Sequence, residues 1–104
     1  MKFDADDKEI LQKMSAFFKR SEDEVSGVEL FVDGVPLYCV TSFDTDTCDV
    51  EVLLPANGGT PIRNPATGNL MTAVIHANEI RVVGKRGWSE TYKRSTDFVF
   101  TGGL

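Results

Sequence analysis

The sequence predicts an α+β domain in which an N-terminal amphipathic helix packs on a five- to six-stranded, mostly antiparallel sheet or on a small, partly open barrel. Apolar residues recur with helical spacing over residues 5–20, and from residue 28 onward they recur with a period of two. Helices do not alternate with the strands, so we do not expect a doubly wound nucleotide-binding fold. A chain of 104 residues, 41% of them apolar, is typical of one domain, here residues 1–104.

The predicted helix over residues 5–20 has an apolar stripe on one face. The residues of this stripe are Ile10, Leu11, Met14, Phe17 and Phe18. Their spacing places them on the same side of a helix, which is expected to face a sheet. Asp6 is the expected N-cap, with Glu9 three residues later as in a capping box.

The β-rich region is expected to run from about residue 28 to residue 101, beginning with a three-stranded meander. Apolar residues alternate from Val28, and Asp33-Gly34 is typical of a two-residue hairpin turn. A second strand is expected from Val35 to about Phe43, and a third over residues 48–54. Pro36 cannot donate a ladder hydrogen bond, so its strand should lie at a sheet edge.

The alternation stops at residues 55–69, a long loop with three prolines and three glycines. Loops of this length are uncommon and tend to be functional. Strands are expected again over residues 70–77, 80–83 and 96–101. Residues 88–95 fit neither a helix nor a strand clearly.

Charge is distributed unevenly along the chain, which has a formal net charge of −5. Residues 26–55 contain six acidic side chains and no basic one, whereas residues 81–104 contain five basic and two acidic side chains. If the two blocks form separate faces, they would steer charged partners. The alternative is that neighbouring strands bring the blocks together and neutralise them.

Catalytic and metal-binding patterns are lacking, so we expect neither an enzyme nor a cofactor. The single histidine, His76, lies in a predicted strand and is expected to be a packed or surface residue. Asp44 and Asp46 resemble the start of a calcium loop, but positions 49 and 55 are not the required Gly and Glu. Cys39 and Cys48 are expected to be reduced, buried thiols, since they are out of register for a cross-strand disulfide.

Two groups of residues are candidates for binding a partner. The acidic group, on the predicted strands and turn of the middle third, is Asp44, Asp46, Asp49 and Glu51. The basic and aromatic group is Arg86, Trp88, Tyr92 and Arg94, to which we add Arg63 of the long loop. Arg, Trp and Tyr are enriched at the centres of protein interfaces. The same residues can instead form an ordinary exposed face or stack on nucleic acid, although the acidic strands disfavour contact with phosphates.

One part of the sequence resembles small β-rich accessory and virion proteins of tailed bacteriophages and prophages. The similar segments are Val32-Asp33-Gly34-Val35-Pro36-Leu37 through Val40, the acids Asp44 and Asp46, Val50-Glu51-Val52, and Glu79-Ile80-Arg81-Val82-Val83. The resemblance covers roughly residues 28–83. It implies a non-enzymatic protein that acts through protein–protein contacts, as a head-decoration, head–tail or tail accessory component. It carries over no catalytic residue.

Such a component is expected to contact other proteins, including further copies of itself in a homo-oligomer. The alternative is an acidic inhibitor or decoy of a host nucleic-acid-binding or defence protein. We expect the protein in the virion or the host cytoplasm and not secreted, because the N-terminal residues do not resemble a signal peptide. No apolar run approaches the about 18 residues that a membrane span needs.

Overall fold

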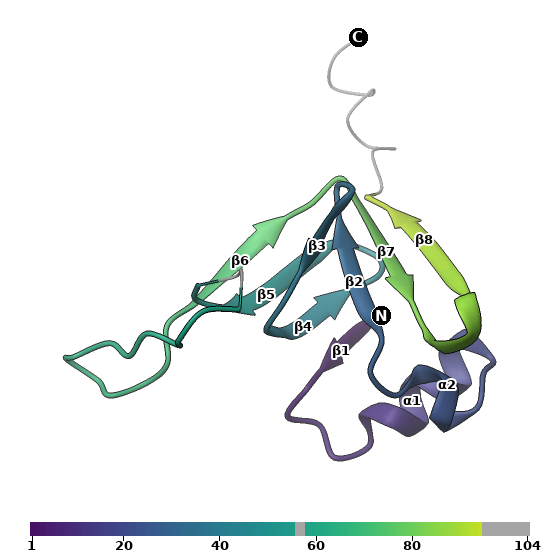
Figure 1. Ribbon diagram of the computed structural model, residues 1–104, viewed down its shortest axis with the longest axis horizontal. Helices are drawn as coiled ribbons and strands as arrows, with labels where there is room; N and C mark the ends of the chain where they lie inside the picture. Colours follow the sequence, from purple (N-terminus) through teal and green to yellow (C-terminus); the bar gives the residue numbers. More distant parts are fainter. Residues whose placement is uncertain (56–57, 95–104) are drawn as a thin grey trace, which may run out of the picture.

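The computed structural model describes residues 1–55 and 58–94 and has two antiparallel sheets of four strands each, together with two helices (Figure 1). The predicted α+β class is confirmed. The described strands number eight, where five or six were predicted, and they form two sheets that are not closed into a barrel. The strand expected over residues 96–101 lies outside the described residues.

Strands far apart in the sequence make up each sheet. The first sheet has the order β1 (Lys2–Asp4), β4 (Val40–Asp44), β5 (Asp49–Leu53) and β6 (Thr72–His76). The second sheet has the order β3 (Val35–Leu37), β2 (Glu29–Val32), β7 (Glu79–Val83) and β8 (Ser89–Lys93). Strand β1 was not predicted, and β8 occupies the stretch whose pattern was ambiguous.

The hairpin turn predicted at Asp33-Gly34 is confirmed, but the meander is not. Asp33 and Gly34 both have positive φ, 48° and 84°, and they join β2 to β3. The predicted strand from Val35 to Phe43 is instead divided between the two sheets. It breaks at Cys39, whose φ of 58° is incompatible with an extended strand. Pro36 lies on the edge strand β3, as its missing amide hydrogen requires.

Helix α1 (Ile10–Phe18) is shorter than the predicted helix over residues 5–20. Its N-cap is Glu9 and no side chain caps it, so the capping role expected of Asp6 is wrong. The carboxylates of Asp4 and Asp7 instead accept the backbone amides two residues ahead and hold the chain in turns before the helix. The helix ends at Lys19, which has a left-handed conformation.

A second, short helix follows directly. Helix α2 (Glu22–Val25) begins with a capping box, in which the Ser21 side chain accepts the Glu24 amide and the Glu24 side chain accepts the Ser21 amide. This helix was not predicted. Its four residues are too few to show a helical period in the sequence.

The core lies between the two sheets and is closed at one end by the helices. Met14 and Phe18 of the predicted stripe are buried there, whereas Leu11 and Phe17 stay partly exposed. The rings of Phe3 and Phe18 lie 5.8 Å apart, and those of Phe3 and Phe43 lie 5.2 Å apart. Helix α1 therefore packs on an aromatic cluster to which the first sheet contributes two rings.

Trp88 is part of this core. It follows the short turn η1 (Lys85–Gly87) and is only 6% exposed. Its ring lies 5.3 Å from that of Phe18, and its Nε1–H donates to the Glu24 carbonyl at 3.0 Å. The Arg20 guanidinium lies over the ring, 5.0 Å from its centroid. Trp88 thereby joins the second sheet to both helices.

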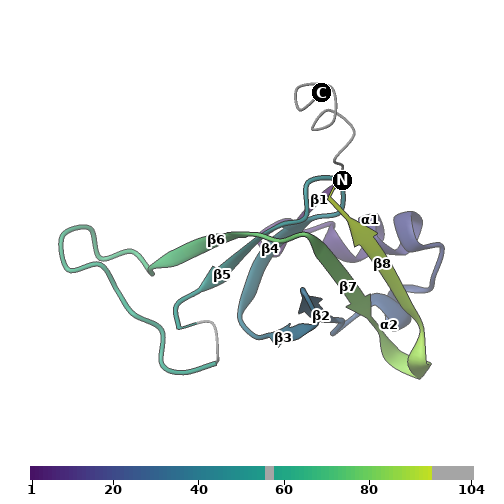
Figure 2. The same cartoon turned by 90° about the horizontal axis from the view of Figure 1, so that it is seen from above.

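Residues 58–71 lie between β5 and β6, and we call this segment the arm. At its base, the Leu54 amide donates to the Met71 carbonyl, the Met71 amide to the Ile62 carbonyl and the Ile62 amide to the Leu54 carbonyl. Further out, Arg63 and Leu70 form an isolated antiparallel bridge. Figures 1 and 2 show the arm extending beyond the strands of both sheets.

Gly84 provides a sharp test of the packing at Trp88. A Cβ atom on Gly84 would lie 2.1 Å from Cε2 of the Trp88 ring. We therefore predict that Gly84→Ala lowers the free energy of unfolding by about 1–3 kcal/mol, as overpacking of a core does. Urea denaturation followed by circular dichroism measures this. Ser89→Ala, at an exposed position of β8, should change stability by less than about 0.5 kcal/mol. Equal stability of Gly84→Ala and the parent would contradict the packing.

Candidate functional site

Three of the four predicted acidic residues line one pocket. Asp44, Asp49 and Glu51 share a pocket of about 290 Å³ on the outer face of the first sheet, which we call the acidic pocket. They meet there because β4 and β5 are paired and alternate side chains of a strand point to the same face. Glu51 accepts a hydrogen bond from Thr41 Oγ1 at 2.8 Å. The alternation in the sequence predicted a shared outer face for Asp49 and Glu51, whereas Asp44 was expected in the turn.

Asp44 and Asp46 are held by groups of the chain itself. Asp44 accepts the backbone amides of Asp46 at 2.8 Å and Thr47 at 3.3 Å. Although partial burial acts in the opposite direction, these bonds and the nearby terminal amine lower the pKa of Asp44. Asp46, outside the pocket lining, lies 2.6 Å from the Met1 amine through Oδ2. The negative charge at this edge is therefore partly compensated.

Asp49 connects the acidic and basic parts of the sequence. Its Oδ1 lies 2.7 Å from His76 Nδ1 and 3.4 Å from Arg94 Nη2. The hydrogen bond from His76 holds the pKa of Asp49 below its ordinary value. Arg94 also donates to the Ala77 carbonyl. Residues of the acidic block and of the basic block are therefore in contact here. His76 is an exposed surface residue, one of the two environments that the sequence predicted for it.

The predicted basic and aromatic group is not one patch. Trp88 is buried in the core, so its expected place on an interaction surface is corrected. Tyr92 is half-buried against Phe17, with ring centroids 5.9 Å apart, and burial raises its pKa. Arg86 is exposed in η1, while Arg94 follows the opposite end of β8. Arg86 and Arg94 are therefore separated by the length of β8.

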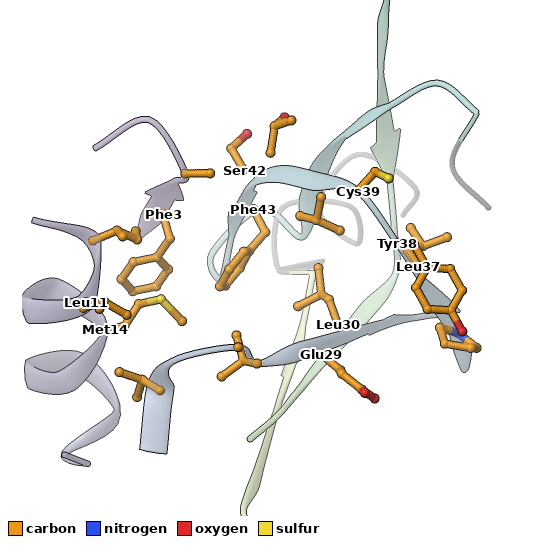
Figure 3. A pocket seen from close by; sticks show the side chains of 18 residues that line it. Phe3, Leu11, Met14, Glu29, Leu30, Leu37, Tyr38, Cys39, Ser42 and Phe43 are labelled. Carbon is orange, nitrogen blue, oxygen red and sulfur yellow. The ribbon is translucent and has the colours of Figure 1, made fainter. Parts of the chain in front are cut away.

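A second hollow is an apolar groove of about 530 Å³, which the sequence did not predict. Its lining residues come from α1, α2, β1, β2, β3, β4 and the segments next to them (Figure 3). Its apolar lining includes Leu11, Met14, Leu30, Leu37, Val40 and Phe43. Tyr38 and Cys39, which join the two sheets, stand exposed at its rim. We call this hollow the apolar groove.

One sequence signal for the groove exists in retrospect. From Val35 to Val40 no charged residue interrupts a run that is more apolar than a half-buried strand requires. Val35 and Tyr38 are each 57% exposed. This apolar run lies where the chain passes from one sheet to the other. It indicates an exposed apolar surface at that position.

The two cysteines differ in environment. Both are free thiols, as predicted. Cys48 is buried, and burial raises its pKa. Cys39 is exposed, so the prediction that both thiols are buried is wrong for it. In the described ranges, no three His, Cys, Asp or Glu residues are arranged to hold a metal ion.

The arm carries a second group of exposed apolar side chains. Ile62 is 48% exposed, and Leu70 and Met71 are each 39% exposed. Val74 of the edge strand β6 is exposed as well, and it lines the acidic pocket. Arg63, the predicted site residue of this segment, donates from Nη1 to the Gly68 carbonyl at 2.9 Å. Arg63 thus lies in the arm, apart from Arg86 in η1 and from Arg94, which follows β8.

Comparison of the chain with protein-family models, with curated proteins and with solved structures found no match. Among the helices of residues 1–55 and 58–94, none has the length and apolar character needed to cross a membrane.

The Asp49–His76 pair yields a pH prediction. Because the pKa of Asp49 is lowered in the folded chain, the pair stabilises the fold above the ordinary aspartate pKa. This contribution is lost as the pH falls through the lowered pKa. We predict that His76→Ala raises the pKa of Asp49 toward its ordinary value, as measured by carboxyl-carbon NMR titration.

A matched control is available in the same titration. Lys13 pairs with Asp7 and lowers its pKa, so Lys13→Ala should raise the pKa of Asp7 and leave that of Asp49 unchanged. An Asp49 pKa that does not move in His76→Ala would contradict the assigned contact.

Proposed function

We propose that the protein is a non-enzymatic interaction protein that works through protein–protein contacts and assembles with further copies of itself. The observation that carries this proposal is the arm, which holds Ile62, Leu70 and Met71 exposed beyond the body of the fold. Exposed apolar side chains gathered on a projecting segment are typical of contact surfaces. The apolar groove supplies a second unfilled surface of the same character.

The setting that we propose is a bacteriophage or prophage assembly. The protein would act in the virion as a head-decoration, head–tail or tail accessory component, made in the host cytoplasm. The resemblance over residues 28–83 supports this setting, and a projecting arm suits a component that must reach a neighbouring subunit. The function requires no catalytic residue, cofactor or nucleic acid.

The alternative is an acidic inhibitor or decoy of a host nucleic-acid-binding or defence protein. The acidic pocket favours it, because Asp44, Asp49 and Glu51 converge on one face. However, the Met1 amine and Arg94 compensate part of that charge. A mimic of nucleic acid needs an uncompensated negative surface to compete for basic residues, so the assembly function is the better supported.

Self-association tests the proposal directly. We predict that the protein forms oligomers in sedimentation velocity as its concentration is raised. The double variant Ile62→Ser/Leu70→Ser should shift the distribution toward the monomer at every concentration, because it removes apolar contacts of the arm. Val35→Ser is the matched control, since it removes an exposed apolar side chain outside the arm.

Three outcomes separate the candidates. A parent protein that is monomeric at all concentrations and salt conditions contradicts the assembly function. Unchanged association of Ile62→Ser/Leu70→Ser contradicts the role of the arm. The inhibitor gains support if the variant Asp44→Asn/Asp46→Asn/Asp49→Asn/Glu51→Gln loses a purified host partner that the arm variant still binds.

A further inference from the structure

We propose that the arm of one copy docks in the apolar groove of a second copy. This inference rests on the proposed self-association and specifies the two surfaces that make the contact. It assigns Ile62 and Leu70 as inserted side chains and the apolar groove as their receiving site. The shape, the apolar character and the charge of the two surfaces each support it.

The groove is suited to receive apolar side chains from outside. A volume of about 530 Å³ lies in the range of about 300–1,000 Å³ in which proteins bind compact ligands. Aliphatic and aromatic side chains of both sheets and α1 form its walls (Figure 3). Leu11 and Tyr38 are exposed at this site. Filling the groove removes their apolar surface from water, which is the main driving force for association.

The arm is suited to be inserted. Its exposed apolar residues, Ile62, Leu70 and Met71, lie on two paired segments, because the Met71 amide donates to the Ile62 carbonyl and Leu70 bridges to Arg63. This pairing places Ile62 and Met71 on one face of the arm and Leu70 on the other, so that the inserted arm presents apolar side chains to both walls of the groove. These backbone bonds preorganise the segment, so docking costs less conformational entropy than ordering a free loop would. Both views of the fold show the arm directed away from the sheets (Figures 1 and 2).

Charge adds selectivity to the fit. Among the described residues that line the groove, Glu29 is the only charged one, and it is exposed. Arg63 is the single charged residue of the sequence over residues 58–71. Opposite charges at the edge of an apolar contact favour the correct register and exclude like-charged partners. Docking places Arg63 beside Glu29 while the apolar side chains enter the groove.

The two surfaces are different, so the contact is heterologous. A head-to-tail series of such contacts closes into a ring or continues as a filament, depending on the rotation between neighbours. Each copy then offers one arm and one groove, which is the arrangement that a repeating assembly component requires.

Native Cys39 makes the contact measurable without further labels. It is exposed in the groove lining, whereas Cys48 is buried and serves as an internal reference. We predict that alkylation of Cys39 by a maleimide slows as concentration rises, by about tenfold when nine in ten grooves are filled. Ile62→Ser/Leu70→Ser should restore rapid alkylation at the same concentration. Glu29→Lys should do the same by placing like charges together.

A covalent trap gives the second readout. Under mild oxidation, Leu70→Cys should yield disulfide-linked dimers through Cys39 of one copy and the introduced thiol of another. The dimers should disappear in Leu70→Cys/Cys39→Ser. Thr91→Cys, exposed on β8, is the matched control and should form no link with Cys39. Circular dichroism confirms that each variant is folded before its result is counted.

The outcomes distinguish this inference from the function on which it rests. Oligomers with neither protection nor crosslinking of Cys39 overturn the docking mode and leave self-assembly standing. A monomer at all concentrations overturns both. A disulfide within one chain, between Cys39 and the thiol introduced by Leu70→Cys, shows that the arm covers its own groove and overturns docking between copies. Protection of Cys39 only by an added small apolar compound would instead assign the groove to a ligand.

Discussion

The packing of helix α1 on aromatic rings from both sheets is the interaction on which the rest of the structure depends. Phe18 contacts Phe3 of the first sheet and Trp88 at the start of β8, with ring centroids 5.8 and 5.3 Å apart. The Trp88 hydrogen bond to Glu24 ties the second sheet to α2 as well. The sheets are therefore joined at the helices and again where β6 leads into β7, around buried Ala77.

The apolar groove lies beside a third connection between the two sheets. Between β3 and β4 the chain crosses from one sheet to the other through the exposed Tyr38 and Cys39. Beside this connection, apolar side chains of both sheets face a hollow of about 530 Å³. In the assembly that we propose, the apolar groove of one copy and the arm of the next complete each other. Each of these two surfaces has one charged residue among the described residues, Glu29 in the groove lining and Arg63 in the arm.

Local features of the fold were predictable from the sequence, and features set by distant contacts were not. The apolar stripe of α1, the Asp33-Gly34 turn and the shared face of Asp49 and Glu51 each follow from neighbouring residues. The division of residues 35–43 between two sheets does not, because sheet membership depends on partners far along the chain. Strand β1 pairs with residues about forty positions away, and three residues are too few to show a period.

Trp88 illustrates the same limit for the candidate site. A tryptophan beside arginines is equally suited to an interface or to a core, since its ring is apolar and its N–H is polar. Only the position of Glu24, whose carbonyl accepts that N–H, distinguishes the two. The sequence predicted a shared face for Asp49 and Glu51, but the contacts of the acidic residues with Arg94 and the Met1 amine depend on tertiary structure.

Isotope-filtered NMR on a sample mixed from ¹³C-methyl-labelled and unlabelled copies tests the docking of the arm in the groove most directly. Such spectra record only contacts between different copies. We predict intermolecular NOEs from the methyl groups of Ile62 and Leu70 to the aromatic protons of Tyr38 and Phe43. An oligomer whose intermolecular NOEs connect other surfaces, with none between the arm and the groove, would contradict this docking.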